Sequence, residues 1–314
     1  MRLRTLRKLE EVAIREEFTQ LEKEQATLCK LTISKARQRT IISKEILEVK
    51  RQFGQGTDLG RRRTEIRQPS VPLKISSAAF VEREDITVIC SYKGWIRMIK
   101  GHLDPNTAVK YKDGDRERFR LHAVTTDKLI LFATNGRFYS LNCDRLPGGR
   151  GLGEPLRLMI DLPNDQELIS ILIHRADMQL IIASSDGRGF LVKGSDIFTD
   201  RRSGKQVLNV SNQVEATICT PVSGEYVAVV GTNRRLLIFP IQYIPILSRG
   251  RGVILQRYKE GSLSDIQVFR EKEGLFWRSG SGIRREKKLE SWHGKRGQSG
   301  RLVPKGFPKR NKFN

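Results

Sequence analysis

The sequence has few of the residues from which catalytic and metal sites are built, with four cysteines and four histidines in 314 residues. The cysteines lie more than 50 residues apart and form no CxxC pair, which makes a zinc site improbable. Three of them, Cys90, Cys143 and Cys219, fall in or beside apolar runs. We therefore expect buried, inert thiols, and a reduced compartment fits this cysteine usage.

Long apolar runs and enzyme signatures are also missing. No apolar stretch approaches the roughly 20 residues of a membrane-spanning helix, and the charged N-terminus is no signal peptide. The glycine-rich run 149–153 is followed by Glu154 and Pro155 rather than by a helix, so it is no dinucleotide fingerprint. No HExxH, GxSxG or kinase motif occurs. The sequence therefore predicts no catalytic residue, no metal site and no cofactor in this chain.

Positive charge is the feature in excess. The chain has 58 lysines and arginines against 35 acidic residues, a formal net charge of +23. An imbalance of this size favours a polyanionic partner, and nucleic acid is the first choice. An anionic membrane, another acidic partner and a merely solvated surface are the alternatives.

One pattern recurs five times in the second part of the chain. In residues 129–155 an apolar run breaks at Asn135 and Gly136, resumes in alternation, and ends in a basic glycine-rich loop. This pattern predicts a β-hairpin followed by a cationic loop. Similar phrases lie at 87–100, 179–193, 226–240 and, more weakly, 275–285. Their turns recur at intervals of about 42 to 51 residues, which indicates propeller-type blades.

Basic residues follow most of these turns and recur in the glycine-rich half of each unit. Repetition would arrange them as a stripe that follows a phosphate backbone. The predicted DNA-binding residues are Lys93, Arg97, Lys100, Arg137, Arg145, Arg150, Arg188, Lys193, Arg201, Arg202, Lys205, Arg234, Arg235, Arg249, Arg251, Arg284, Arg285, Lys295 and Arg296.

The first 53 residues lack proline and glycine and predict one long helix. Its apolar residues follow a coiled-coil spacing, interrupted by a polar waist at Thr32, Lys35 and Arg39. A lone helix with an exposed apolar stripe is not stable, so another chain or sequence upstream of Met1 must cover it. The seam residues are Ile14, Phe18, Leu21, Leu28, Ile42, Ile46, Val49 and Phe53.

The remaining boundaries follow from composition. Residues 54–72 predict a linker, in which the arginines 61–63 are either a solvated hinge or a phosphate contact. Residues 73–308 hold the repeats, and residues 309–314 predict a basic tail. We therefore expect a mainly β protein, preceded by one long coiled-coil helix.

Several phrases make the chain resemble the A subunits of bacterial type IIA topoisomerases, the gyrase A-like family. Residues 2–11, the helix to Phe53 and Gly54, and residues 62–66 are similar to the end of the breakage-reunion core. The repeats resemble the C-terminal β-pinwheel. Several short segments resemble the topoisomerase IV branch of the family more than the gyrase branch. They are residues 94–97 with 100–102, 146–147 with 150–156, 187–190, 239–240, and 247–248 with 250–252.

The resemblance implies a five-bladed, open β-pinwheel whose blades exchange strands and whose basic rim bends double-stranded DNA and presents it for strand passage. It implies that the helix is the returning arm of a coiled coil, with a dimeric exit gate around Leu3 and Leu6. The implied partners are DNA, a second copy, the upstream part of the same polypeptide and the ATPase B subunit. ATP and Mg²⁺ would act in the complete enzyme. The implied location is cytoplasmic and nucleoid-associated, with a peripheral membrane association left open.

Two departures limit the resemblance. None of the six tyrosines lies in the family's catalytic context, so the chain alone is expected to be inactive. The gyrase-type glutamine-led box has only degenerate copies at 148–153 and 249–252, which favours decatenation or relaxation over negative supercoiling. A propeller-like protein-interaction scaffold with a helical oligomerisation arm is the alternative function. A complete topoisomerase polypeptide with another nucleophile is a weaker one.

Overall fold

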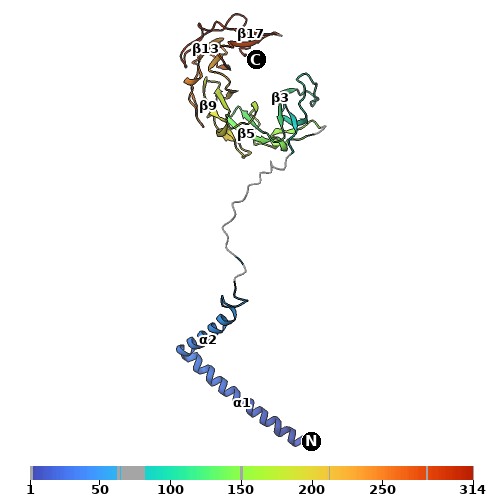
Figure 1. Ribbon diagram of the computed structural model, residues 1–314, viewed down its shortest axis with the longest axis vertical. Helices are drawn as coiled ribbons and strands as arrows, with labels where there is room; N and C mark the ends of the chain where they lie inside the picture. Colours follow the sequence, from blue (N-terminus) through green and yellow to red (C-terminus); the bar gives the residue numbers. More distant parts are fainter. Residues whose placement is uncertain are drawn as a thin grey trace. The chain divides into compact units, whose positions relative to one another are not determined.

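The computed structural model describes residues 3–61, 64, 82–148, 151–211, 213–280 and 282–313. The chain forms two compact units, Met1–Lys74 and Ile75–Asn314 (Figure 1). The first unit is helical and the second is built from strands. None of the described helices is both long and apolar enough to cross a membrane.

The first unit contains two helices, α1 (Leu3–Ile33) and α2 (Lys35–Phe53), so the prediction of one continuous helix is wrong. The break falls at Ser34, whose φ of −104° and ψ of 104° are extended. It coincides with the polar waist of the seam, where β-branched Thr32 and Ile33 precede a serine, all poor helix formers. Gln38 bridges the break, because its Nε2 donates to the carbonyl of Thr32 at 3.0 Å.

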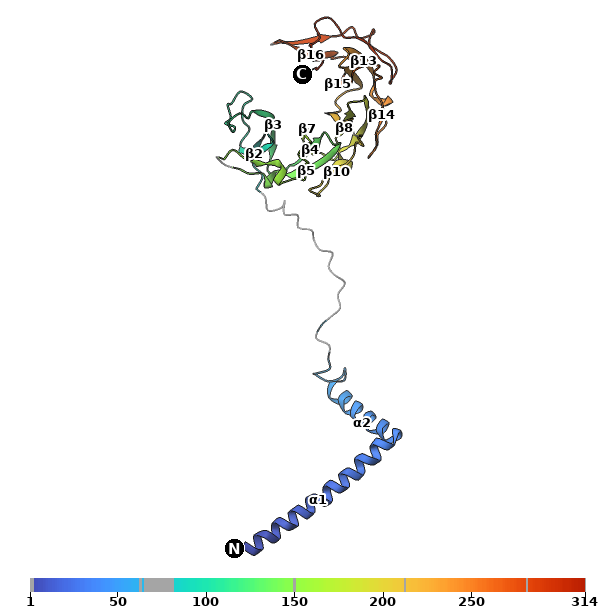
Figure 2. The same cartoon turned by 180° about the vertical axis from the view of Figure 1, so that it is seen from behind.

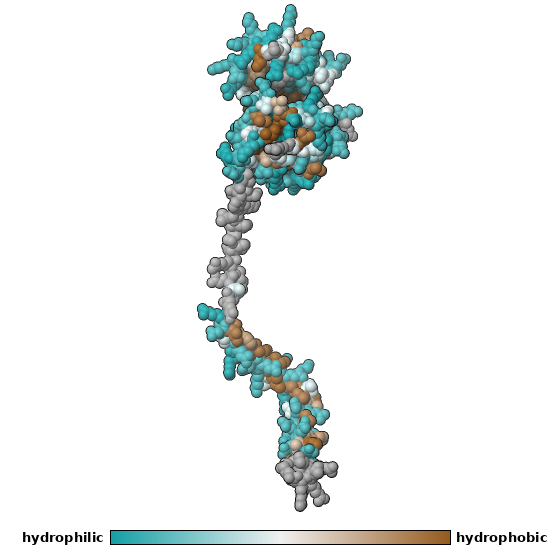
Figure 3. Space-filling model, turned by 90° about the vertical axis from the view of Figure 1, so that its right-hand side faces the viewer, coloured by the Kyte–Doolittle hydropathy of each residue, from teal (hydrophilic) through white to brown (hydrophobic). Residues whose placement is uncertain are grey.

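The apolar seam of these helices lies on the surface. Ile14, Phe18 and Ile46 are 65%, 60% and 60% exposed, and Figure 3 shows brown side chains along both helices. The coiled coil that would cover them stays a prediction. The side chains of Leu3 and Leu6, the predicted dimer gate, lie outside the described part of the structure, as does most of the predicted linker. Residues 54–61 form turns, in which Thr57 Oγ1 accepts from Gly60 N at 3.0 Å.

The described residues of the second unit form four four-stranded antiparallel sheets, all of one topology, and a further hairpin. The first sheet has the order β3-β1-β2-β6. Its strands are β1 (Asp85–Ser91), β2 (Trp95–Lys100), β3 (Glu117–Val124) and β6 (Glu154–Pro155). The second has the order β10-β5-β4-β7. Its strands are β4 (Lys128–Ala133), β5 (Arg137–Asn142), β7 (Leu168–Ile173) and β10 (Lys205–Gln206).

The third and fourth sheets repeat this arrangement as β11-β8-β9-β14 and β15-β12-β13-β18. The third contains β8 (Gln179–Ser184), β9 (Arg188–Lys193), β11 (Ala216–Pro221) and β14 (Val253–Ile254). The fourth contains β12 (Tyr226–Gly231), β13 (Arg235–Pro240), β15 (Leu263–Phe269) and β18 (Arg301–Leu302). The last hairpin pairs β16 (Leu275–Ser279) with β17 (Gly282–Glu286).

Neighbouring sheets exchange strands. Each sheet consists of a hairpin, a third strand that follows it, and a two-residue fourth strand that arrives only after the next hairpin is complete. Thus β6 joins the first sheet after β4 and β5 have formed the second hairpin. This topology confirms the expected strand exchange. The described residues give four complete sheets and a two-stranded fifth, so the count of five blades stays a prediction.

The sheets follow one another around an arc, with β3 near one end and β17 near the other (Figures 1 and 2). On this arc the fourth strands β10 and β14 lie on the convex side, and β7 and β15 on the concave side. The convex side is therefore where these two exchanged strands are added.

The hairpin turns explain the recurrence of the sequence pattern. In the second sheet, Gly136 has a φ of +72°, its N–H donates to Ala133 at 2.9 Å, and Asn135 Oδ1 accepts from Arg137 N at 3.0 Å. Gly94 and Gly187 adopt the same positive φ in their turns. In the fourth sheet Arg234 replaces the glycine with a φ of +59°.

The core lies between adjacent sheets. In β4, Leu129 and Leu131 pack towards the first sheet, while Ile130 and Phe132 pack towards the third. Because both faces of the strand are covered, the sequence shows a continuous apolar run instead of alternation.

The C-terminal residues belong to this core, so the predicted basic tail is wrong for its described part, 309–313. Phe313 is 1% exposed and packs with Phe307, whose ring centroid lies 5.4 Å from that of Trp277. The basic composition suggested solvent, but an aromatic residue at the end of the segment anchors it in the last hairpin.

Candidate nucleic-acid interface

Four short loops lead into the exchanged fourth strands, and we call them the exchange loops. They are residues 148–153, 200–204, 248–252 and 295–300, of which 149 and 150 lie outside the described residues. Each ends in a glycine of positive φ, namely Gly153 (+91°), Gly204 (+68°), Gly252 (+74°) and Gly300 (+75°).

The four glycines occupy equivalent positions against the preceding sheet. A Cβ on Gly300 would lie 2.4 Å from the carbonyl oxygen of Leu236, the second residue of β13. The other three glycines meet the second residue of their own second strand at 2.5 to 2.7 Å. Only glycine combines this φ with this close approach. The exchange loops therefore have one structural role, repeated four times.

The exchange loops carry most of the predicted cations of the glycine-rich halves. Arg201, Arg202, Arg249, Arg251 and Lys295 are exposed. Arg296 is half-buried and donates from Nη1 to the carbonyl of Ile254 at 2.8 Å. Arg150 lies outside the described residues. Three of the four loops thus present cations to solvent in the part of the chain that the structure describes.

In two of the four sheets the first residue of the exchanged strand is also basic, whereas β6 begins with Glu154 and β14 with Val253. Lys205 opens β10 and is exposed, as predicted for an interface residue. The equivalent residue of β18 is Arg301, also exposed, which sequence reasoning missed. Arg301 further shares a hollow of about 550 Å³ with Arg257 and Lys259, two more basic residues that were missed. Arg301 directly follows Gly300, as Lys205 directly follows Gly204, and this shared position is the signal that could have identified Arg301.

The predicted cations of the hairpins are mostly engaged with the protein itself. Arg97 is 8% exposed. Arg137 donates to Gln206 and Ser203, and Arg188 lies 3.6 Å from Asp186. Arg235 is exposed and donates to Gly300 O at 3.1 Å. Two loop cations are engaged as well, because Arg202 lies 3.7 Å from Asp161 and Arg249 donates to Asn209 Oδ1 at 3.3 Å. The contrast therefore separates Arg97 and Arg137 from Arg201, Arg251 and Lys295.

Arg234 also binds the chain rather than solvent. Its Nη1 donates to Pro308 O and to Asn311 Oδ1, both at 3.2 Å. These contacts hold the C-terminal segment against the fourth hairpin.

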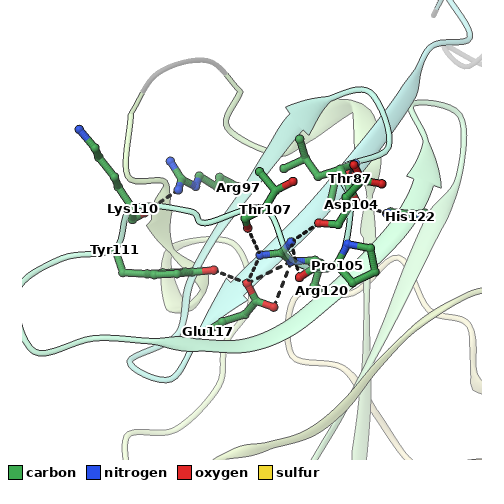
Figure 4. Close-up of polar contacts among 11 residues, drawn as sticks. Thr87, Arg97, Asp104, Pro105, Thr107, Lys110, Tyr111, Glu117, Arg120 and His122 are labelled. Carbon is green, nitrogen blue, oxygen red and sulfur yellow. Dashed lines mark hydrogen bonds and ion pairs between the residues drawn. The ribbon is translucent and has the colours of Figure 1, made fainter.

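A polar network surrounds Arg97 in the first sheet (Figure 4). Arg97 donates to Lys110 O at 2.6 Å, and Arg120 contacts Glu117 at 2.6 Å and Thr107 O at 3.0 Å. Burial, together with a hydrogen bond to Glu117, raises the pKa of Tyr111 to about 12. Although burial opposes it, hydrogen bonding from Arg120 and Tyr111 holds the pKa of Glu117 below its usual range. The network fixes the loop between β2 and β3.

The other predicted cations lie outside the exchange loops. Lys93 is exposed and donates to Asp113 O at 3.2 Å, and Lys100 pairs with Glu84. Arg145 is exposed in a 3-10 turn, and Lys193 is exposed at the end of β9. Two exposed arginines, Arg284 and Arg285, lie in β17.

The described residues contain no group of three or more His, Cys, Asp or Glu side chains that could hold a metal ion. Cys90, Cys143 and Cys219 are buried and free, as expected, and Cys29 is exposed. Burial raises the pKa of the Cys90 and Cys143 thiols to about 12. The prominent site is therefore a charged surface.

Repeated four-stranded sheets with exchanged strands and basic loops define a β-propeller-type domain. A family described as the DNA gyrase C-terminal domain, beta-propeller, matches residues 127–175, 179–215 and 225–266. The chain is 41% identical over 314 residues to the A subunit of DNA topoisomerase 4 from Rickettsia bellii, covering 100% of this chain and 42% of the relative. It is 38% identical over 322 residues to the corresponding protein of Caulobacter vibrioides, covering 99% and 42%.

Solved structures agree. The C-terminal domain of E. coli ParC superposes with a TM-score of 0.64 at 25% identity, covering 72% of this chain and 96% of that one. The C-terminal domain of DNA topoisomerase IV gives a TM-score of 0.59 at 20% identity, covering 71% and 73%, and supports the fold alone. The chain therefore belongs to the gyrase A-type family of C-terminal β-propellers. Within it, the chain is similar over its whole length to the C-terminal part of topoisomerase IV A subunits, and it spans less than half the length of those relatives.

Proposed function

We propose that the second unit binds double-stranded DNA along a track formed by the exchange loops. The observation that carries this proposal is the structural equivalence of the four loop glycines on successive sheets, together with the exposed cations that precede three of them. Cations repeated in this way complement the repeated phosphates of a duplex. Such contacts read no bases, so binding is expected to be largely independent of sequence.

The arc supports DNA bending. The exchanged strands β10 and β14 lie on its convex side (Figure 2), so a duplex that follows successive loops follows a curved path. Bending costs several kcal/mol for a site of 20–30 base pairs. Contacts on several sheets at once offset that cost. The loops lack a well-formed glutamine-led box, which favours a modest bend.

In the complete enzyme this region would present duplex DNA for ATP-dependent strand passage, leading to decatenation, relaxation and chromosome segregation. The proposed partners are a second copy of the chain, the upstream part of the same polypeptide and the ATPase B subunit. ATP and Mg²⁺ would act there, in the cytoplasm on the nucleoid. The exposed apolar seam of α1 and α2 fits a returning coiled-coil arm that the upstream part covers.

A salt titration of DNA binding tests the proposal. Arg201, Arg251, Lys295 and Arg301 are replaced by glutamine together, and the control replaces Arg270, Lys272, Lys287 and Lys288, which are equally exposed but lie outside the loops. The loop variant is expected to bind nonspecific duplex more weakly. Its plot of log K against log salt should be shallower by up to about 4, since each phosphate contact contributes about 0.9.

Two outcomes would contradict the proposal. If both variants weaken binding equally, net charge rather than the loops determines affinity. If the unaltered chain ignores duplex DNA at low salt, the protein-interaction scaffold becomes the better function.

A further inference from the structure

Three arginines on the hairpins reach across to exchange loops that belong to the next repeat. Arg137 donates from Nη1 to Ser203 O at 2.8 Å and from Nε to Gln206 Oε1 at 3.0 Å. Arg235 donates from Nη1 to Gly300 O at 3.1 Å. Arg97 donates to Gly151 O. In each case the acceptor lies within, or directly after, the loop that feeds the fourth strand of the same sheet.

These contacts join segments that are distant in sequence. Arg97, Arg137 and Arg235 lie 54, 66 and 65 residues from the carbonyls they bind. The fourth strands themselves have only two residues each, and β10 pairs with β5 at just two positions. So short a strand supplies few backbone hydrogen bonds, and the arginines add side-chain bonds at the point where the loop arrives.

We propose that Arg97, Arg137 and Arg235 are positioning residues that hold the basic exchange loops in place for DNA. The inference rests on the proposed DNA-binding function. Each arginine binds a loop carbonyl across the sheet, so its loss should loosen the loop even where other N–H groups of the guanidinium stay free. Ordering a loop before binding removes an entropic cost from the binding step, so the benefit appears as affinity.

The third sheet provides an internal comparison. Arg188 has the turn position of Arg137 and Arg235, but it pairs with Asp186 inside its own turn at 3.6 Å. The exchange loop of that sheet is held by the backbone, since Asn209 N donates to Gly250 O at 2.8 Å and Gly250 N donates to Val207 O at 2.9 Å. Replacing Arg188 should therefore leave its exchange loop in place.

The test is Arg137→Lys, which keeps the charge and removes the two-pronged donor geometry that a single ammonium does not reproduce. In the whole chain without DNA, amide hydrogen exchange across residues 204–208 is expected to accelerate while the melting temperature of the unit changes little. Affinity for nonspecific duplex should then fall by about threefold to tenfold, as for the loss of one or two hydrogen bonds. A direct phosphate contact would instead be largely preserved by lysine.

Arg188→Lys and Arg270→Lys are the controls: the first should keep normal exchange in the exchange loop of its own sheet, and the second should keep normal exchange and affinity. Should Arg137→Lys fail to fold, Arg235→Lys repeats the test on residues 300–303. Wild-type exchange in the loop of the Arg137→Lys or Arg235→Lys variant would overturn the proposal. If the variant exchanges faster but the unaltered chain binds no DNA, the arginine does position the loop and the proposed DNA-binding function is wrong.

Discussion

The carboxylate of Asp265 accepts a hydrogen bond from the backbone of Phe313, with 2.9 Å between Oδ2 and the amide nitrogen. Its other oxygen accepts from Ile266 N, also at 2.9 Å. Asp265 lies in β15 and Phe313 at the end of the described chain, so this contact fastens the C-terminal segment to the fourth sheet. Burial raises the pKa of the Asp265 carboxyl although both N–H bonds oppose the shift.

Asp265→Asn should remove the pH dependence of stability that this carboxyl contributes. The pKa of the Asp265 carboxyl is higher in the folded protein than in the unfolded chain, where it has its ordinary value of 3.8. The contribution of this group to stability is therefore complete below pH 3.8 and is lost as the pH rises through the pKa of the folded state. Asparagine does not ionise, but its amide nitrogen cannot accept the second N–H bond, so the variant lacks one hydrogen bond at every pH. Urea unfolding should therefore show that the stability of the unaltered protein relative to the variant is greater at about pH 4 than at about pH 7. Asp113→Asn, at an exposed position, is the control for the loss of one carboxylate elsewhere on the surface.

Phe313→Ala should destabilise the second unit by about 3–5 kcal/mol, the usual cost of removing a buried phenylalanine. The side chain is 1% exposed and packs between Phe307 and the last hairpin. The neighbouring Lys312→Ala, at an exposed position, should change stability by less than about 0.5 kcal/mol. Equal effects of the two changes in denaturant titrations would mean that the C-terminal segment is a free tail after all.

Gly300→Ala should cost more stability than Gly94→Ala. Both glycines have positive φ, +75° and +79°, which alone costs about 1–2 kcal/mol in a residue with a side chain. At Gly94 a Cβ meets nothing within 4 Å, but at Gly300 it meets Leu236 O at 2.4 Å. The exchanged strand β18 must therefore move away from β13. Thermal unfolding of the two variants compares them directly, and identical melting temperatures would contradict the close approach.

One of the four thiols should react quickly with a disulfide reagent in the native state. Cys29 is exposed, whereas Cys90, Cys143 and Cys219 are buried and burial raises their thiol pKa. Since the thiolate is the reactive form, these three should be modified only as the protein unfolds. Cys29→Ser should abolish the fast phase. A second fast thiol in that variant would show that one of the sheets opens readily.

Much of the second unit was predictable because its pattern is local. Each hairpin is formed by consecutive residues. An apolar run is followed by a tight turn that usually contains glycine, and basic residues come soon after the turn. The first strand is apolar throughout because sheets cover both of its faces, as for Leu129 and Ile130 in β4. The helix break at Ser34 was less visible, because the sequence marked only an interruption of the seam there.

The candidate site was predictable only as a set of cations. The sequence did not separate Arg97, which is buried and bound to carbonyls, from Arg251, which is exposed in an exchange loop. Both are basic residues close to glycines in a repeated unit. Arg301 was missed because its role depends on lying directly after Gly300, at the start of a strand of only two residues.

By itself, the sequence determined the repeat, the turns, the excess of positive charge and the apolar seam of the helices, since each depends on residues close together in the chain. The tertiary structure decided which cations face solvent and which hold the fold together. The reason is that Arg97, Arg137 and Arg235 donate to backbone carbonyls more than 50 residues away in the sequence. These carbonyls lie in loops before exchanged strands, whose pairing no local pattern reveals.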